Sequence, residues 1–369
     1  MSDYEGAGKR RAEKPRGWMR RHWIGVSIAS VLSVVLIGGG AYAWGLMNSL
    51  GGIDKVPGQA SIKEENRPDP APGEALNILV LGADAEADGN NNKSSIKADL
   101  DSEGRWKEGR VHRSDTIMVA HVSADRKNVS VVSIPRDSYV TIYDEEGEPR
   151  GEDKINAAFA NYGPAGAIST VEHITNLRMD HMVIMDWDGF KDMTEAVNGV
   201  RVYIPESFYD SSQKVQWDKG WHNLKGKRAL QYVRTRYGLS NGDFDRIQRQ
   251  QNFIRLLLKK MMSGANVTNP VALQKTVSSV AQNLTIDEGF TNSDITGLAW
   301  ALRGVSVDNV DFMTVPTAGY GTSDNGQSIV LLDETKGKDL WRMVRNDKVK
   351  KYLRLNPDAA KLGTETEVS

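Results

Sequence analysis

The stretch Ala75–Asp84 reads ALNILVLGAD and decides the fold class of this chain. It is a short apolar run that ends near a glycine, which is typical of a β-strand buried on both faces of a sheet. Two similar runs follow, TIMVAHV at Thr116–Val122 and VSVVSI at Val129–Ile134. Strand and helix patterns then alternate along the chain, and this alternation predicts an α/β fold with helices covering a central sheet.

The remaining apolar periodicity places the other elements. Strand patterns cover 181–187, 200–204, 310–315 and 328–332, and helical patterns cover 155–160, 165–177, 189–197, 226–232, 244–263, 270–282 and 333–344. A strand or helix pair is expected within 284–303. Residues 85–112 are polar and predict a long loop, which in a compact domain is usually functional or disordered. The contribution of this loop stays open.

The N-terminal segment predicts a membrane anchor. Residues 24–46 have no charged side chain, and about 20 apolar residues are enough to cross the hydrocarbon core as a helix. Trp23 and Trp44 lie near the two ends, where aromatic rings favour the membrane interface. Residues 1–23 contain seven basic and three acidic residues, so the positive-inside rule keeps this tail in the cytoplasm. A cleaved signal peptide is the alternative, although its apolar stretch is normally shorter.

The domain organisation follows from these segments. Gly51–Gly73 is rich in Gly, Pro and charge, which predicts an extended stalk. The expected order is a cytoplasmic basic tail (1–23), one transmembrane helix (24–46), an extracytoplasmic linker (47–75), a folded domain (76–346) and a C-terminal tail (347–369). The expected location is therefore the cell membrane, with the folded domain outside the cytoplasm.

Bulk composition excludes several classes of protein. The 369 residues include no cysteine, which excludes a disulfide framework, a thiolate nucleophile and a Cys-ligated metal centre. The formal net charge is −1, and the only dense basic run is the N-terminal tail. Nucleic acid is therefore not an expected partner.

Arginines at the ends of predicted elements indicate an anion site. Arg136 directly follows a strand pattern in SIPRDSYV. Arg234 and Arg236 lie in YVRTRYG, and Arg246 lies in DFDRIQRQQ. Because the planar guanidinium binds phosphate oxygens in pairs, several such residues in a chain without net positive charge favour a specific phosphate site. The alternative is that each arginine forms a surface ion pair, which contributes little.

Helical spacing orients the residues of the third arginine cluster. From Phe244 onward, apolar residues recur at 247, 254, 257, 258 and 261, the spacing of an amphipathic helix. Arg246 and Gln250 are four residues apart and share one edge of the apolar stripe, so both are expected to point into the protein. Arg249 falls on the far side and is expected in solvent. The preceding helix is expected to end near Tyr232.

Acidic residues beside the predicted strands suggest a magnesium site. Asp84 ends the first strand and Asp115 opens the next. Mg²⁺ in proteins is typically held by one or two carboxylates together with water and substrate phosphate oxygens. The alternative is that each aspartate only caps a turn. Of Asp243 and Asp245, one is a candidate helix N-cap and the other a candidate base that accepts a proton from an attacking hydroxyl.

Seven motifs in order resemble those of the LytR-CpsA-Psr family, and the resemblance extends over about Leu76 to Asn346. The motifs are GAD (82–84), RSDT (113–116), SIPRD (133–137), DKINAAF (153–159), ALQYVRTR (229–236), DFDRIQRQQ (243–251) and VPTAGYG (315–321). One such motif is weak evidence, but seven in order over this length are highly specific.

The resemblance implies a fold, an activity and a role for each candidate residue. The fold would be an α/β/α sandwich around a mixed sheet, with an apolar cavity for a lipid. The activity would be phosphotransfer of a glycopolymer from polyprenyl pyrophosphate to peptidoglycan, with Mg²⁺. The implied residues are Asp84 and Asp115 for the metal, Arg136, Lys154, Arg234, Arg236, Arg246 and Gln250 for the pyrophosphate, and Arg136 and Asp243 for catalysis.

Two other functions stay open at this stage. One is hydrolysis of the polyprenyl pyrophosphate, with water in place of the sugar acceptor. The other is a non-enzymatic regulatory or lipid-binding protein. The sequence does not identify the polymer, the general base or the oligomeric state.

Overall fold

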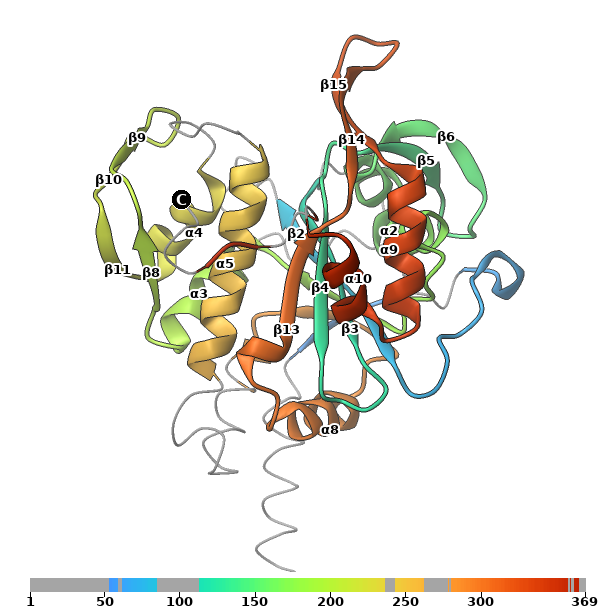
Figure 1. Ribbon diagram of the computed structural model, residues 1–369, viewed down its shortest axis with the longest axis horizontal. Coiled ribbons are helices and arrows are strands. Elements are labelled where there is room, and N and C mark those ends of the chain that lie inside the picture. The colour runs from blue at the N-terminus through green and yellow to red at the C-terminus, as the bar shows by residue number, and fades with distance from the viewer. Residues whose placement is uncertain are drawn as a thin grey trace, which may run out of the picture. The chain divides into compact units, whose positions relative to one another are not determined.

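The strand that opens the domain, β2 (Leu76–Asp84), is the middle strand of a seven-stranded mixed sheet in the computed structural model. The structure describes residues 53–58, 62–84, 113–235, 243–261, 278, 280–357, 359 and 362–364, and of Asp84, Arg113 and Asp243 only the backbone. The sheet order is β1-β12-β7-β2-β3-β4-β13 (Figure 1). β2 is parallel to β7 and antiparallel to β3, so the sheet is mixed as the resemblance implied.

The other strands of this sheet differ in length and include segments from both ends of the described chain. They are β1 (Asp54–Val56), β3 (Arg113–Val122), β4 (Val129–Ile134), β7 (His181–Met185), β12 (Thr285–Asp287) and β13 (Val310–Thr314). Four two-stranded ribbons surround it: β5 (Tyr139–Tyr143) with β6 (Pro149–Lys154), β8 (Val200–Ile204) with β11 (Gly220–Leu224), β9 (Phe208–Asp210) with β10 (Val215–Trp217), and β14 (Thr317–Thr322) with β15 (Ser328–Leu332).

The described helices cover both faces of the sheet. They are α2 (Asn156–Thr175), α3 (Trp187–Ala196), α4 (Gly226–Arg234), α5 (Asp243–Met261), α8 (Asn292–Leu302), α9 (Glu334–Arg345) and α10 (Val349–Leu355), with 3-10 turns η2 (Glu64–Asn66) and η4 (Val307–Asn309). The helix expected at 270–282 lies mostly outside the described residues. None of the helices in the described part of the chain is long and apolar enough to span a bilayer, and the expected anchor at 24–46 lies outside that part.

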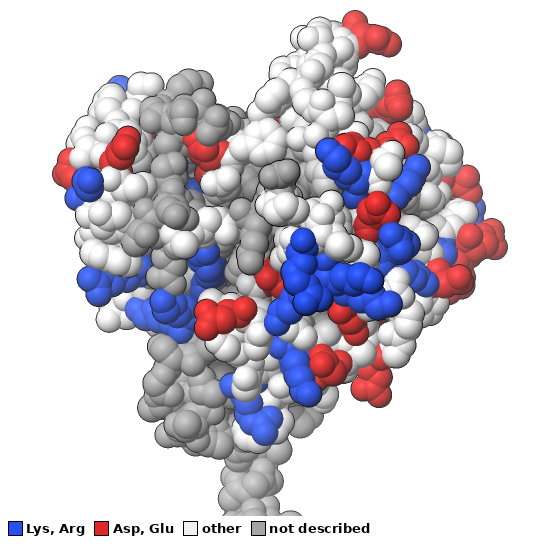
Figure 2. Space-filling view, in the orientation of Figure 1, with Lys and Arg blue, Asp and Glu red and all other residues white. Residues whose placement is uncertain are grey.

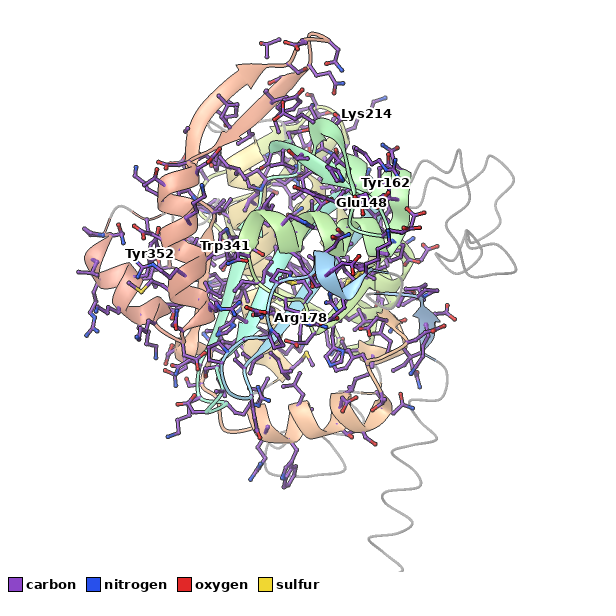
Figure 3. The ribbon with its side chains drawn as sticks, turned by 90° about the vertical axis from the view of Figure 1, so that its right-hand side faces the viewer. Glu148, Tyr162, Arg178, Lys214, Trp341 and Tyr352 are labelled. Atoms are coloured by element: carbon purple, nitrogen blue, oxygen red, sulfur yellow. The ribbon has the colours of Figure 1, made fainter. Side chains whose placement is uncertain are left out.

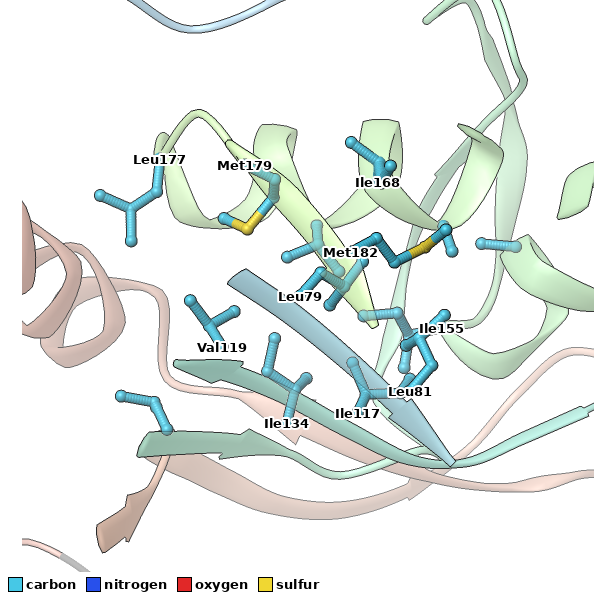
Figure 4. Packing of buried hydrophobic residues seen from close by; sticks show 14 of the residues in the cluster. Leu79, Leu81, Ile117, Val119, Ile134, Ile155, Ile168, Leu177, Met179 and Met182 are labelled. Atoms are coloured by element: carbon cyan, nitrogen blue, oxygen red, sulfur yellow. The ribbon is translucent and has the colours of Figure 1, made fainter. Parts of the chain in front are cut away.

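One face of the sheet packs against α2, α9 and α10. Leu79 and Leu81 are two residues apart on β2, so both side chains point to this face. Both are almost fully buried, and Figure 4 shows their packing. Ile168 of α2 and Trp341 of α9 belong to the same apolar cluster. Tyr352 of α10 completes this layer, seen from the side in Figure 3.

The opposite face packs against α5. Met118, Val131 and Phe312 form a smaller buried cluster there, against which Ile254 and Leu258 of α5 pack. Because the sheet buries apolar side chains on both faces, its strands read as continuous apolar runs in the sequence. The layers are helix, sheet, helix, which confirms the predicted α/β/α arrangement.

The described residues of the predicted stalk, 53–58 and 62–73, pack against the domain. β1 pairs in parallel with β12 at the edge of the sheet, and Val56 is fully buried. Further along, the Arg67 guanidinium binds the carboxylate of Glu172 in α2 and donates to the Met179 carbonyl. Composition predicted an extended linker because Gly and Pro dominate locally, but these long-range contacts join the segment to the domain.

The residues after Asn346 also extend the core. α10 buries Val349 and Tyr352, and the backbone amide of Leu362 donates to the Phe312 carbonyl at 3.0 Å. The expected tail at 347–369 is therefore folded at least as far as these contacts.

Candidate functional site at the carboxyl end of the sheet

The strands place three of the predicted site positions, Asp84, Asp115 and Arg136, at one end of the sheet. β2 ends at Asp84, which lies opposite Arg113, where β3 begins. β4 pairs with β3 so that Ile134 lies opposite Ile117, and continuing this register brings Arg136 opposite Asp115. The carboxyl ends of strands in open α/β sheets are the usual place for ligands.

A β-bulge sets the position of Asp115. Gly82 lies opposite Thr116 and Ala83 opposite Ser114, so Asp115 is the extra residue between two pairs. Such bulges often occur beside active sites because they redirect a side chain out of the regular alternation. Gly82 also allows this close approach, since a Cβ at that position would lie 3.0 Å from the Thr116 Cβ.

Four side chains of alternating charge form a row of ion pairs: Asp115, Arg136, Asp137 and Lys154. Arg136 forms an ion pair with the Asp115 carboxylate, and both side chains are more than four-fifths buried. The Arg136 Nε lies 3.5 Å from Asp137, and the Lys154 ammonium lies 3.1 Å from the other oxygen of Asp137. The structure therefore brings Asp115, Arg136 and Lys154 together. Sequence reasoning missed the role of Asp137 in this cluster, although it follows Arg136 directly.

Helix α5 brings Arg246 to the same end of the sheet. The Gln251 side-chain amide donates to Ser133 Oγ and to the Met313 carbonyl, both at 2.8 Å, near the ends of β4 and β13. Farther along α5, Leu258 packs in the cluster that includes Val129 at the start of β4. The helix therefore runs opposite to these strands, and its first turn lies beyond their carboxyl ends (Figure 1).

The burial of α5 confirms two of the sequence predictions and contradicts a third. Arg246 and Gln250 are both buried, as expected. Arg249 was expected in solvent, but it is fully buried and lies 5.1 Å from the ring centroids of both Phe208 and Tyr232. Burial lowers the pKa of the Arg249 guanidinium, against the opposing effect of Tyr232. The prediction for Arg249 was wrong because α5 packs against the sheet on one side and is covered by Phe208 and Tyr232 on the other.

The end of α4 places Arg234 near α5. The Gln250 side-chain amide lies 3.4 Å from the Val233 carbonyl, which it can reach as a donor. Arg234 is exposed and lies over the ring of Trp187, 4.7 Å from its centroid. Trp187 begins α3 just after β7, whose Met185 lies opposite Gly82 of β2. Arg234 therefore lies at the same end of the sheet, and α4 ends two residues beyond the expected Tyr232.

Three candidate residues stay predictions. Arg236 lies outside the described residues, and the side chains of Asp84 and Asp243 are not described. Asp243 is the first residue of α5, so its backbone lies one turn before Arg246. The structure thus brings arginines from β4, α4 and α5 to one end of the sheet, which is what an anion site requires.

The hydrogen bonds of Gln251 predict a stability effect. Replacement of Gln251 by leucine is expected to lower the free energy of unfolding by about 1–3 kcal/mol, because it removes a buried donor to two acceptors. Urea denaturation followed by circular dichroism measures this change. The control is Gln248→Ala on the same helix, where the side chain is exposed and little change is expected. Equal midpoints for the two variants would contradict this account of how α5 is held.

The chain belongs to the LytR_cpsA_psr family, whose model matches residues 51–346. It is 30% identical over 336 residues to the cell wall biosynthesis protein LcpA of Corynebacterium glutamicum, covering 84% of this chain and 62% of LcpA. It is also 30% identical over 271 residues to the polyisoprenyl-teichoic acid–peptidoglycan teichoic acid transferase TagU of Bacillus cereus, covering 71% of this chain and 80% of TagU. The chain therefore spans less than two thirds of LcpA.

The fold resembles that of solved members of this family. The crystal structure of B. subtilis TagV superposes with a TM-score of 0.59 at 24% sequence identity, and covers 74% of this chain and 97% of that chain. At this identity the likeness shows the fold alone.

Proposed function

We propose that this protein transfers a glycopolymer from a polyprenyl-pyrophosphate carrier to peptidoglycan and joins them through a phosphodiester. The observation that carries the proposal is the cluster of Asp115, Arg136 and Lys154 at the carboxyl end of the sheet, with Arg246 beyond it on α5. The family relationship, and the similarity to the teichoic acid transferase TagU, support the same class of reaction.

The reaction requires a hydroxyl of the acceptor sugar to attack the phosphorus that bears the glycopolymer. A new P–O bond forms to the acceptor, the bridging P–O bond breaks, and polyprenyl monophosphate leaves. Arg136 and Arg246 would bind the diphosphate oxygens and neutralise the charge that develops there. Asp243 is the proposed base that takes the hydroxyl proton, since its backbone lies one turn before Arg246.

The residues at the site fit a magnesium ion held partly by the substrate. The described side chains contain no group of three or more His, Asp or Glu that would form a complete protein cage. Mg²⁺ normally needs only one or two carboxylates when phosphate oxygens supply other ligands. Asp115, with Asp84 on the adjacent strand, would hold it, and the ion would withdraw charge from the phosphate oxygens.

The magnesium proposal predicts a specific metal dependence. Chelation with EDTA is expected to abolish transfer, and added Mg²⁺ is expected to restore it. In an Asp115→Asn variant, the Mg²⁺ concentration for half-maximal rate is expected to rise by at least about 10-fold, because loss of a residue that only orients a metal ligand already costs about 10- to 100-fold in affinity. Titration of the rate with Mg²⁺ measures this shift. Full activity of both proteins in EDTA would exclude the metal.

The lipid part of the donor requires an apolar surface. Several apolar side chains between the sheet and helices α3 and α5 are only partly buried, among them Val80, Ala120, Phe190, Ile254 and Leu258. We propose that the polyprenyl chain covers them. The proposed anchor at 24–46, with the domain outside the cytoplasm, would keep the enzyme at the membrane that contains this donor.

Reconstitution tests the function directly. The full chain in detergent, Mg²⁺, a polyprenyl-pyrophosphate glycan and peptidoglycan oligomers are expected to yield a covalent glycan–peptidoglycan product, detected by mass spectrometry. Release of glycan phosphate without transfer, in the presence of acceptor, would instead identify a pyrophosphatase. Binding of the donor with neither release nor transfer would point to a non-enzymatic regulatory protein.

A further inference from the structure

Tyr320 of β14 is an exposed aromatic residue near the proposed site. At 62% relative exposure, it is the most exposed large aromatic side chain in the described part of the chain. β14 begins three residues after β13 ends, and the β14–β15 hairpin projects beyond the carboxyl end of the sheet (Figure 1). An aromatic side chain with this exposure is accessible to a ligand that binds at this end of the sheet.

A second aromatic ring connects Tyr320 to the first turn of helix α5. The ring of Phe244 meets it edge to face, with centroids 6.0 Å apart and an interplanar angle of 82°. This geometry is a favourable arrangement of two aromatic rings. Phe244 lies in the first turn of α5, two residues before Arg246. The contact therefore connects the hairpin to the helix end that presents the anion-binding arginine.

The pairing of β14 with β15 places Tyr320 close to the acidic end of the cluster. Tyr320 lies opposite Val330, whose backbone amide donates to the Asp137 carbonyl at 2.8 Å. Gly319 and Gly321 flank Tyr320 on the strand, and Gly319 has φ +124°, a conformation that side chains rarely adopt. The neighbouring positions on β14 therefore carry no side chain.

The charge of the hairpin identifies the class of ligand. Thr317–Leu332 contains one charged residue, Asp324, which lies in the turn. Figure 2 shows the projecting hairpin as uncharged surface with acidic colour at its tip. An uncharged aromatic surface does not suit a diphosphate or a polyanion. It suits a pyranose ring, whose C–H groups pack on the electron-rich face of an aromatic ring.

The geometry of phosphoryl transfer indicates whether the donor glycan or the acceptor glycan would lie at Tyr320. The attacking and leaving oxygens lie roughly in line on opposite sides of the phosphorus. In the proposed function the leaving polyprenyl phosphate lies toward the apolar side chains between the sheet and α5. The attacking hydroxyl must then approach from the outer side, where the hairpin projects.

We propose that Tyr320, supported by Phe244, is a binding platform for a pyranose ring of the acceptor glycan strand. This inference rests on the function proposed above and extends it to acceptor recognition. The donor diphosphate is bound by the arginine cluster, while the acceptor is positioned by the hairpin.

A binding experiment that needs no catalysis tests the platform. A soluble peptidoglycan tetrasaccharide of alternating N-acetylglucosamine and N-acetylmuramic acid is titrated into the full chain in detergent and followed by calorimetry. Tyr320→Ala is expected to weaken binding by about five- to tenfold, whereas Tyr320→Phe, which keeps the ring, is expected to stay within about twofold of wild type. Tyr209→Ala is the control, since Tyr209 on β9 is also an exposed tyrosine.

The outcomes separate this inference from the proposed function. Equal binding by wild type and Tyr320→Ala overturns the platform, whether or not the protein transfers glycopolymer. In the transfer assay, Tyr320→Ala is expected to raise KM for the acceptor and not for the donor, and an equal rise in both overturns it as well. If wild type binds the tetrasaccharide through Tyr320 but transfers nothing, the proposed function fails and the glycan site remains.

Discussion

Replacement of Arg136 by alanine is expected to lower kcat/KM for glycopolymer transfer by roughly 10- to 150-fold, because a charge-assisted contact contributes about 1.5–3 kcal/mol. Arg136 also neutralises Asp115 and lies beside Asp137. Its loss would also remove the guanidinium that lies between these two carboxylates, which places the effect toward the upper end of this range. Initial rates at varied donor concentration measure it.

Two variants show whether the effect belongs to the site. Arg136→Lys keeps the charge but loses the planar fork, so an intermediate rate is expected. Arg150→Ala removes an arginine of the neighbouring β6 that pairs with Asp144 and is 53% exposed, and transfer is expected to continue at the wild-type rate. A folded Arg136→Ala protein with wild-type kcat/KM would remove Arg136 from the mechanism.

Replacement of Glu172 by alanine is expected to lower the free energy of unfolding by about 3–5 kcal/mol, the usual cost of removing one partner of a buried ion pair. Glu172 is fully buried and Arg67 is 5% exposed. Two Arg67 nitrogens bind the two carboxylate oxygens at 3.1 and 2.5 Å, and the Met179 amide also donates to Glu172 at 2.8 Å. Thermal and urea denaturation measure the loss.

The chain offers a matched control for this pair. Arg178 binds Glu64 through two contacts of 2.5 and 2.8 Å, but Glu64 is 75% exposed. Glu64→Gln is therefore expected to change stability little, because solvent screens surface ion pairs. A double variant, Arg67→Met with Glu172→Met, is expected to be more stable than Glu172→Ala, since no buried charge is left unpaired. Equal losses for Glu64→Gln and Glu172→Ala would show that burial is not the cause.

Local sequence was sufficient where an element is defined by its own residues. The apolar run of β2 predicted a strand buried on both faces because the alternating side chains are apolar on either side. Arg246 and Gln250 were predicted inside because helical spacing puts them at the edge of the apolar stripe.

Residues whose setting depends on distant segments could not be predicted in this way. Arg249 was assigned to solvent because spacing along one helix shows only that helix's most apolar face. In the fold, Phe208 and Tyr232 cover the other side. The bulge at Asp115 likewise depends on the register with β2, which no local pattern specifies.

The sequence by itself determined the class of fold and where the main strands of the sheet lie along the chain, because these follow from short-range apolar periodicity. It also marked Arg136, which directly follows one of those strands. Only the tertiary structure decided that residues 54–56 join the sheet edge, that Arg67 is anchored to Glu172 more than 100 residues away, and that Asp115, Arg136 and Lys154 share one cluster. Those contacts form when distant segments pack together, and the free energy of that packing is not encoded at any one position.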